Sequence, residues 1–245
     1  MIKLTLIEGD ALEVLPTLES ESADLVLTDP PYPNFDLFTN KKTEDFYISI
    51  FTELYRILKK DKFLITFWSI SDLPNIFRIM EKAGFNYTWQ VINYIKNADK
   101  NHIRVGFNHY NTALIFEKGR AKRVEQIRDV IEDVTSSIKR KEIQHPTPKT
   151  LKVVESLIKF STKEGDVVLD PFLGSGTTMI ASKNLKRNCI GIEINHEYIE
   201  IAKKRLNWGS SLSNGIEWEF KVVKKWLIEK SKEIEKKVVK NEKRN

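Results

Sequence analysis

The sequence Asp-Pro-Pro-Tyr at residues 29–32 directly follows the short apolar run at residues 25–27. Proline has a fixed φ and no backbone N–H, so two prolines in succession end a strand at the acidic residue. In open parallel sheets, ligands bind at the carboxyl ends of the strands. A carboxylate, a fixed carbonyl and an aromatic ring at such an edge suit a flat ring that carries an amino group. Taken alone, the tetrapeptide is equally compatible with a strand that ends in a proline turn.

A glycine-rich segment, Asp-Pro-Phe-Leu-Gly-Ser-Gly-Thr-Thr at residues 170–178, follows another apolar run and opens an expected helix. Glycine lets a ligand approach the backbone closely, and the N–H groups of a helix N-terminus bind anions. Glu193 follows about twenty residues later, where an acidic residue can hold a ribose diol. The combination predicts a nucleoside-containing cofactor. The incomplete glycine fingerprint disfavours NAD, and the absence of Gly-Lys-Ser/Thr excludes a Walker A loop.

Runs typical of strands alternate with amphipathic helical runs along the chain. The expected strands cover residues 3–7, 23–28, 63–68, 87–95, 111–116, 166–170 and 188–194, with residues 216–223 left undecided. The expected helices cover residues 11–18 (a short helix or turn), 43–58 with Thr43 as N-cap, 73–83, 151–160, 179–185, 198–206 and 224–239. This order predicts an α/β fold with a doubly wound, mostly parallel sheet. Residues 87–95 and 111–116 look like a β-hairpin.

The chain of 245 residues is long enough for one large α/β domain with a full hydrophobic core. Its longest apolar runs are far too short to span a membrane, and its N-terminus alternates like a strand and does not read as a signal peptide. The single cysteine, Cys189, excludes an internal disulfide, and the four histidines lack metal-ligand spacing. We therefore expect a cytoplasmic protein without a metal site.

The net charge of +6 is concentrated at the C-terminus. Residues 221–245 hold ten Lys/Arg against four Asp/Glu, so the charges of the preceding 220 residues balance. Residues 118–141 carry a second local excess of eight basic over four acidic residues. A polyanionic partner fits this distribution. The competing explanation of the tail is a solvated, lysine-rich helix.

Five segments together resemble the β group of the S-adenosylmethionine-dependent DNA amino-methyltransferases, which methylate adenine N6 or cytosine N4. Asp-Pro-Pro-Tyr matches the family's catalytic motif, and residues 170–178 match its cofactor motif. Glu-Gly-Asp at residues 8–10, His-Pro-Thr-x-Lys at residues 145–149 and Gly-Ile-Glu-Ile at residues 191–194 also match. The resemblance covers residues 3–207. Because the catalytic motif precedes the cofactor motif, it implies a Rossmann-like methyltransferase sheet with circularly permuted motif order.

The resemblance also implies roles for particular residues. It assigns the target base to the turn formed by Asp29, Pro30, Pro31 and Tyr32. It also implies contacts with each part of the cofactor. The adenine is assigned to Asp10 and Ala11, and the ribose to Glu193. The methionine and adenosine are assigned to Phe172, Gly174 and Gly176, the carboxylate end to Thr147, Lys149, Thr177 and Thr178, and further contacts to Asp170 and Ser175 of the same loop. One departure is Pro-Lys-Thr at residues 148–150, where the family often has Gln-Lys-Pro.

On this basis residues 1–117 form the catalytic half of the methyltransferase domain, and residues 145–207 form the half that binds S-adenosyl-L-methionine. Residues 118–144 are a short, charged and moderately helical insertion, at the place where the family usually carries a target-recognition domain. Residues 208–245 are expected to form a basic, helical C-terminal extension. The partners implied are double-stranded DNA, a second copy of the chain and a restriction endonuclease, with no membrane.

The activity that the resemblance implies is methylation of N6 of an adenine flipped out of DNA, because the family usually pairs Asp in the first motif position with adenine. The carboxylate of Asp29 and the carbonyl of Pro30 can each accept one N–H of the amine, which stabilises the charge that grows during attack. Cytosine-N4 methylation is the nearest alternative. Methylation of RNA or of a protein amide, and a non-catalytic cofactor-binding subunit, are further alternatives. The strand position of Cys189 disfavours a C5-cytosine mechanism.

Overall fold

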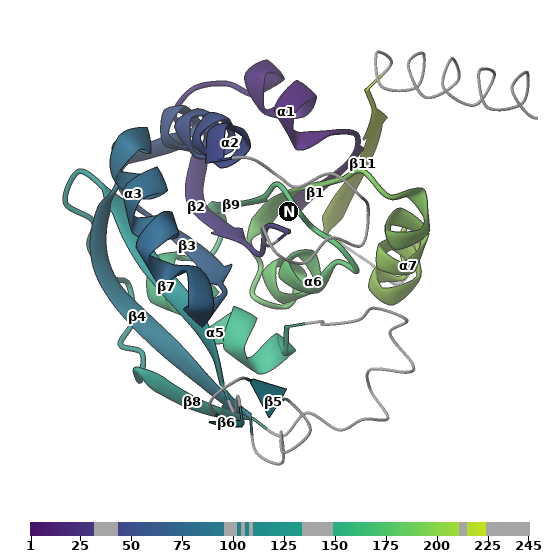
Figure 1. Cartoon of the computed structure of the whole chain (residues 1–245). Coiled ribbons are helices and arrows are strands. Elements are labelled where there is room, and N and C mark those ends of the chain that lie inside the picture. Colours follow the sequence, from purple (N-terminus) through teal and green to yellow (C-terminus); the bar gives the residue numbers. More distant parts are fainter. Residues whose placement is uncertain are drawn as a thin grey trace, which may run out of the picture.

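The computed structural model describes residues 1–31, 44–95, 102–103, 106–107, 110–133, 149–210 and 215–223. Its centre is a nine-stranded sheet with the strand order β11-β1-β10-β9-β2-β3-β7-β4-β8 (Figure 1). Neighbouring strands run parallel except at β7, which is antiparallel to both β3 and β4. The strands are β1 (Ile2–Glu8), β2 (Ala23–Thr28), β3 (Leu58–Trp68), β4 (Asn86–Ile95), β7 (Tyr110–Lys118), β8 (Val130–Asp133), β9 (Val167–Asp170), β10 (Asn188–Glu193) and β11 (Ile216–Val222).

Helices cover both faces of this sheet, with α1, α2 and α3 on one face and α5, α6 and α7 on the other (Figure 1). Strands β5 (His102–Ile103) and β6 (Gly106–Phe107) pair separately. The helices are α1 (Ala11–Val14), α2 (Glu44–Ile57), α3 (Leu73–Ala83), α5 (Leu151–Ser161), α6 (Thr177–Asn184) and α7 (His196–Leu206), with 3-10 turns η1 (Leu15–Thr17) and η2 (Ile70–Asp72).

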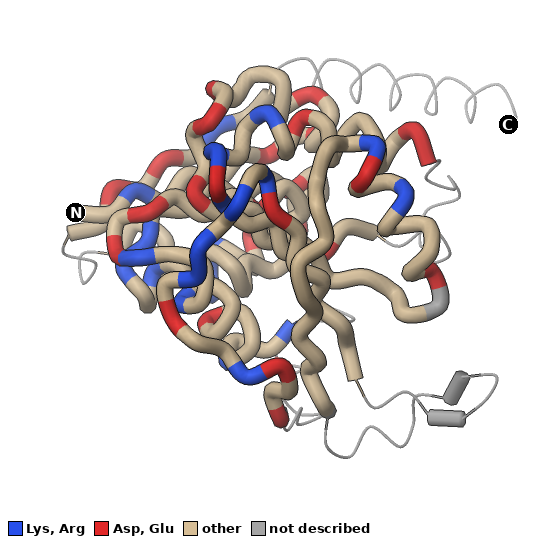
Figure 2. Tube along the Cα trace, turned by 90° about the vertical axis from the view of Figure 1, so that its left-hand side faces the viewer, with Lys and Arg blue, Asp and Glu red and all other residues tan. Residues whose placement is uncertain are grey.

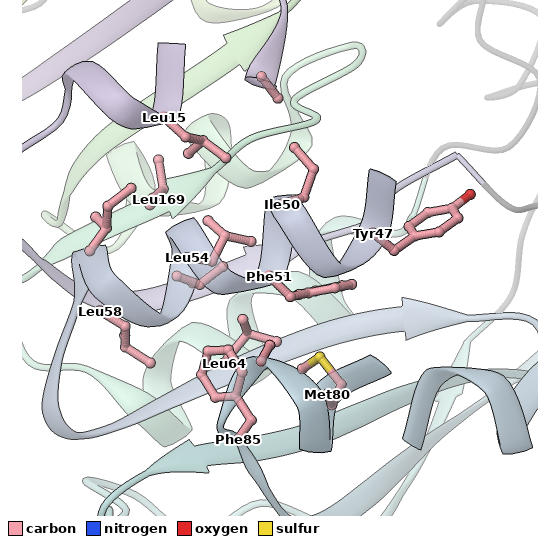
Figure 3. Packing of buried hydrophobic residues seen from close by; sticks show 14 of the residues in the cluster. Leu15, Tyr47, Ile50, Phe51, Leu54, Leu58, Leu64, Met80, Phe85 and Leu169 are labelled. Carbon is pink, nitrogen blue, oxygen red and sulfur yellow. The ribbon is translucent and has the colours of Figure 1, made fainter. Parts of the chain in front are cut away.

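Strand β2 is buried on both faces, as expected for the centre of a parallel sheet. Successive side chains point to opposite faces, so Val26 joins the cluster under α2 whereas Leu25 and Leu27 join the cluster under α5. The cluster under α2, called the α2 cluster below, includes Phe51 and Leu54, which are fully buried (Figure 3). The two clusters hold β2 rigidly between two layers of helices.

The direction of the chain crossovers reverses between β9 and β2. From β9 the chain passes through α6 to β10 on one side, and from β2 it passes through α2 to β3 on the other side. In doubly wound sheets such a switch point leaves a crevice at the carboxyl ends of the two strands, where ligands bind. Here those ends carry Asp170 and Asp29.

The doubly wound, mostly parallel sheet confirms the predicted fold class. The antiparallel pairing of β4 with β7 confirms the expected hairpin partners. The catalytic motif follows β2 and the cofactor motif follows β9, which gives the permuted order that the sequence indicated. The undecided residues 216–223 form β11, which lies parallel to β1 at the edge of the sheet.

Three expectations about secondary structure are wrong. Strand β3 begins at Leu58 and not at residue 63. Its first residues are mostly charged and lie where the pairing with β2 shifts register, so they show no apolar strand pattern. The helical character expected for residues 118–144 is absent from the described part, where β8 joins the sheet beside β4 and buries Ile131. The helical extension expected from residue 208 includes strand β11. The Thr43 cap and the helix at residues 224–239 lie outside the described residues.

Lys and Arg intermingle with Asp and Glu over the face seen in Figure 2. Within the described part of the chain, no helix combines the length and the apolar character needed to cross a membrane.

Asp24 ties together the first residues of three central strands. It lies in β2 and is 7% exposed. Its Oδ2 accepts hydrogen bonds from Lys59 Nζ at 2.8 Å and from the Val167 N–H at 3.0 Å, and Lys62 Nζ lies 3.2 Å from its Oδ1. Burial alone would raise the pKa of Asp24, but the bonds from Lys59, Val167 and Lys62 outweigh burial and lower that pKa. The carboxylate therefore stabilises the end of the sheet opposite the switch point.

We expect Asp24→Asn to lower the free energy of unfolding at neutral pH by about 2 kcal/mol, because two charge-assisted bonds are lost. A lowered folded-state pKa stabilises the fold above the ordinary value of 3.8 and ceases to do so as pH falls through the folded value. The difference in free energy of unfolding between the variant and the wild type therefore shrinks in acid. Urea unfolding at a series of pH values, from neutral to below the folded-state pKa of Asp24, measures this difference, with exposed Asp129→Asn as the control. A deficit that stays constant with pH would contradict the assignment.

Candidate active site

A cavity lies at the carboxyl ends of β2 and β9. The predicted site residues that line it are Asp29, Lys149, Asp170, Phe172, Gly174, Ser175, Thr177 and Thr178. The fold thus brings the predicted base-binding turn and the predicted cofactor loop, which are far apart in the sequence, to one cavity.

Asp29 lines the side of this cavity that is predicted to hold the methyl acceptor. The residue is partly exposed, Pro30 behind it is buried, and Pro31 is exposed. Lys149 Nζ donates to Asp29 Oδ2 at 2.5 Å and lies 5.0 Å from the centre of the Phe67 ring. The side chain of Lys149, which the resemblance assigned to the cofactor's carboxylate end, therefore contacts the catalytic turn in this structure.

The loop between β9 and α6, residues 171–176, forms the other side of the cavity and is called the donor loop after its predicted role. Gly174 and Gly176 adopt φ values of +54° and +87°, in the left-handed region that favours glycine. A Cβ on Gly176 would lie 2.9 Å from the Ala202 Cβ of α7, so the loop packs directly on that helix. Helix α6 then begins at Thr177, which lines the cavity together with Thr178. The helix N-terminus is thereby turned toward the site.

Asp170 is the last residue of β9 and is 4% exposed. Its Oδ1 accepts the Phe172 N–H at 3.1 Å. Complete burial raises the pKa of Asp170 to about 7, and the negative charges of Asp29 and Glu193 add to this effect, although hydrogen bonds from Thr178 and Phe172 oppose it. The carboxyl group is thus poised to ionise near neutral pH, and a cation in the cavity would favour its charged form.

Glu193, at the end of β10, is 8% exposed, and burial raises its pKa. Its Oε2 accepts the Gly174 N–H and its Oε1 accepts the Asn195 N–H, both at 2.8 Å. The side chain therefore braces the glycine loop against the start of α7. Its predicted contact with a ribose stays a prediction.

Asp10 and Ala11 lie at the same edge of the sheet, because β1 pairs with β10 and the Gly9 N–H donates to the Glu193 carbonyl at 2.9 Å. Asp10 caps α1, with its Oδ1 accepting the Leu12 N–H at 2.9 Å, and Ala11 is buried. Neither residue lines the cavity itself. Their expected place beside the cofactor adenine is untested.

Two predicted site residues, Tyr32 and Thr147, lie outside the described residues. The described residues contain no group of three or more His, Cys, Asp or Glu side chains that could hold a metal ion. The expectation that the protein has no metal site stays a prediction.

Arg205 supports the donor loop and was missed by sequence reasoning. Its Nη1 donates to the Ser175 carbonyl at 2.5 Å and to the Ser175 Oγ at 2.9 Å, and burial lowers the pKa of the guanidinium. Arg205 lies on the face of α7 that also carries Ala202, three residues earlier, so the helix contacts the loop through a small residue and a cation. No motif in the sequence indicates this contact, because a helical arginine near the C-terminus of a helix is ordinarily a solvated charge.

The fold and the site define a Rossmann-like methyltransferase with permuted motif order, in which a loop for a nucleoside cofactor faces an Asp-Pro-Pro turn. The family model described as DNA methylase, N6_N4_Mtase, matches residues 23–204. The chain belongs to this family of DNA N6 and N4 amino-methyltransferases.

Relatives and solved structures agree with this family. Type II methyltransferase M.HpaI of Haemophilus parainfluenzae is 30% identical, over 82% of this chain and 74% of its own length. DNA adenine methyltransferase YhdJ of Escherichia coli (strain K12) is 27% identical, over 85% of this chain and 84% of its own length. The crystal structure of the M1.HpyAVI–SAM complex is 30% identical, with a TM-score of 0.67 over 83% of this chain and 99% of that one. Two other relatives, both 43% identical, match over only 38% and 36% of their length.

Because burial raises the pKa of Asp170 to about 7, we predict that cofactor binding depends on pH. S-adenosylmethionine carries positive sulfonium and ammonium groups, which would favour the ionised form of a carboxyl group beside them. We expect its affinity to rise up to a pH of about 7 and then to level off, with a loss of up to about tenfold per pH unit below that value.

Calorimetric titration in two buffers of different ionisation enthalpy measures the proton that binding releases below neutral pH. Asp170→Asn should bind the cofactor with an affinity that is flat over the same range. A wild-type affinity that is equally flat, with no proton released, would rule out this role of Asp170.

Proposed function

We propose that the protein moves a methyl group from S-adenosyl-L-methionine to the N6 amine of an adenine in double-stranded DNA. The observation that carries the proposal is the meeting of Asp29 with the loop of residues 170–178 in one cavity. Family membership supports the methyl donor and DNA as the substrate. Asp at the first position of the catalytic motif supports adenine, as does the similarity to YhdJ.

The residues of the cavity fit the proposed methyl donor. Thr28 lines the cavity, and its buried Oγ1 has no hydrogen-bond partner among the described residues, as expected of a polar site that a ligand completes. Asp170 suits the positive end of the donor, and Thr177 with Thr178 at the start of α6 suits its carboxylate. When bound, S-adenosylmethionine supplies an electrophilic methyl group on a sulfonium sulfur.

Asp29 and Pro30 act on the amine that accepts this methyl group. The lone pair of an aromatic amine is delocalised into its ring, which makes it a poor nucleophile. Hydrogen bonds from the amine to the Asp29 carboxylate and the Pro30 carbonyl favour a pyramidal nitrogen and stabilise the developing positive charge. A carboxylate offers about four acceptor positions, so Asp29 can bind Lys149 and the amine together.

The target base has to leave the DNA duplex to reach Asp29, since the exocyclic amine of a stacked base is out of reach of a cavity. The ring of Tyr32, the last residue of the motif, is expected to stack on the flipped base. A homodimer, a partner restriction endonuclease, a target-recognition role for residues 118–144 and a cytoplasmic location stay predictions.

Label transfer tests the proposed function. The protein is incubated with methyl-tritiated S-adenosylmethionine and, in separate reactions, with duplex DNA, RNA or a protein mixture, and the DNA is digested to nucleosides. We expect the label in N6-methyldeoxyadenosine from the duplex. Label in N4-methyldeoxycytidine would overturn the choice of base. Label only in RNA or protein, or in none of the substrates, would overturn the proposed function.

A further inference from the structure

Tyr47 in α2 contacts the catalytic turn from behind. Its hydroxyl donates a hydrogen bond to the Pro31 carbonyl at 2.5 Å, although the residue is only 1% exposed. Figure 3 shows the ring at one end of the α2 cluster, with the hydroxyl directed away from the other labelled side chains. A buried phenol of the α2 cluster thus binds the backbone of the turn.

The position of this hydroxyl is set by rigid neighbours. The Tyr47 ring stands edge-on to the rings of Trp68 and Phe46, with centroid distances of 5.2 Å in both cases. Trp68 is itself fixed by a hydrogen bond of 3.1 Å from its Nε1 to Asp72 Oδ2. Burial, with a smaller contribution from the charge of Asp72, raises the pKa of Tyr47, so the phenol remains a donor throughout the neutral range.

The catalytic turn lies beyond the strand pairing that holds β2 in the sheet. Thr28 is the last residue of β2 that pairs with β3. The next residues include two prolines, which have fixed φ angles but donate no backbone hydrogen bond. Pro31 confines the ψ angle of Pro30 to the extended region, and the remaining variation of ψ within that region sets the exact direction of the Pro30 carbonyl. The sheet pairing at Thr28 and the bond from Tyr47 to Pro31 hold the turn at both ends.

We propose that Tyr47 is a positioning residue for the acceptor half of the site. By holding the Pro31 carbonyl it fixes the direction in which the Pro30 carbonyl and the Asp29 carboxylate meet the amine. This inference rests on the proposed function, because it concerns the same transfer to an exocyclic amine. Tyr47 does not line the cavity, so its role would be exerted through the turn.

Tyr47→Phe removes the hydroxyl and keeps the ring that packs on Trp68. We expect kcat for DNA methylation to fall about tenfold, because a small displacement of reacting groups is costly, with KM for S-adenosylmethionine changed by less than about twofold. The matched control is Tyr55→Phe on the same helix. The Tyr55 ring packs on Phe85, and its hydroxyl has no hydrogen-bond partner among the described residues. We expect this control to keep the wild-type kcat and KM.

The outcomes separate the inference from the proposed function. A wild-type protein that transfers no methyl group to DNA would overturn the proposed function and, with it, this role of Tyr47. An active wild type with an equally active Tyr47→Phe variant would overturn the role of Tyr47 alone. A variant whose KM for the cofactor and thermal midpoint deteriorate in step with kcat would make Tyr47 merely structural.

A second measurement tests the contact without activity. In protein labelled with carbonyl-13C proline, the Pro31 resonance should move in Tyr47→Phe and stay in place in Tyr55→Phe, because hydrogen bonding to a carbonyl changes its shielding. A Pro31 resonance that is unchanged in both variants would overturn the contact on which the inference depends.

Discussion

The parallel pairing of β2 with β9 is the interaction on which the rest of the structure depends. Leu25 pairs with Val168 and Val26 pairs with Leu169, so both strands end within a few residues at the same edge of the sheet. Their crossovers then leave in opposite directions, which opens the cavity between the two following loops. Asp29 and Asp170 face one cavity because of this register, and a slip of one residue would turn their side chains to the opposite face.

The loops at this edge are held by side chains from the surrounding helices. Tyr47 of α2 binds the carbonyl of Pro31, and Arg205 of α7 binds the carbonyl of Ser175. Each bond fixes backbone that lacks strand pairing of its own. At the opposite end of the same strands, Asp24 joins β2, β3 and β9 through its two lysines and one N–H donor. The site is therefore built on elements that are fixed at both ends, which limits the reorganisation needed during reaction.

The charges of the cleft follow from this construction. Asp29, Asp170 and Glu193 gather at the carboxyl edge, and burial together with their mutual repulsion raises the pKa of Asp170 to about 7. Lys149 pairs with Asp29, and the guanidinium of Arg205 lies behind the donor loop. A ligand that brings positive charge relieves the repulsion among the carboxyl groups. This arrangement favours a cationic methyl donor over an anionic nucleotide.

The parts of the fold that could be predicted from the sequence are those with local patterns. The apolar run before Asp29 and the glycine loop after Asp170 predict where two strands end. These strand ends in turn predict the parallel sheet and the two halves of the site. Strand β8 was not predicted because its sequence shows no clear apolar pattern: Ile131 is buried, whereas its neighbours Val130 and Glu132 are exposed.

The missed supports of the site have no local pattern at all. The bond between Tyr47 and Pro31 joins residues on either side of the segment 32–43, and the contact of Lys149 with Asp29 joins residues 120 positions apart. Such pairs depend on tertiary packing, which neither periodicity nor a short motif specifies. The family motif identified Lys149, but only the structure gave its partner.

The central claim is that the cavity consists of a donor half and an acceptor half that meet at Asp29. The most direct test measures cofactor affinity and single-turnover methyl transfer in the same Asp29→Ala preparation. We expect transfer to fall about a hundredfold or more while affinity for S-adenosylmethionine stays within about threefold, because Asp29 acts on the amine and not on the donor. Loss of cofactor binding together with transfer, or full transfer without the carboxylate, would contradict the division of the site into two halves.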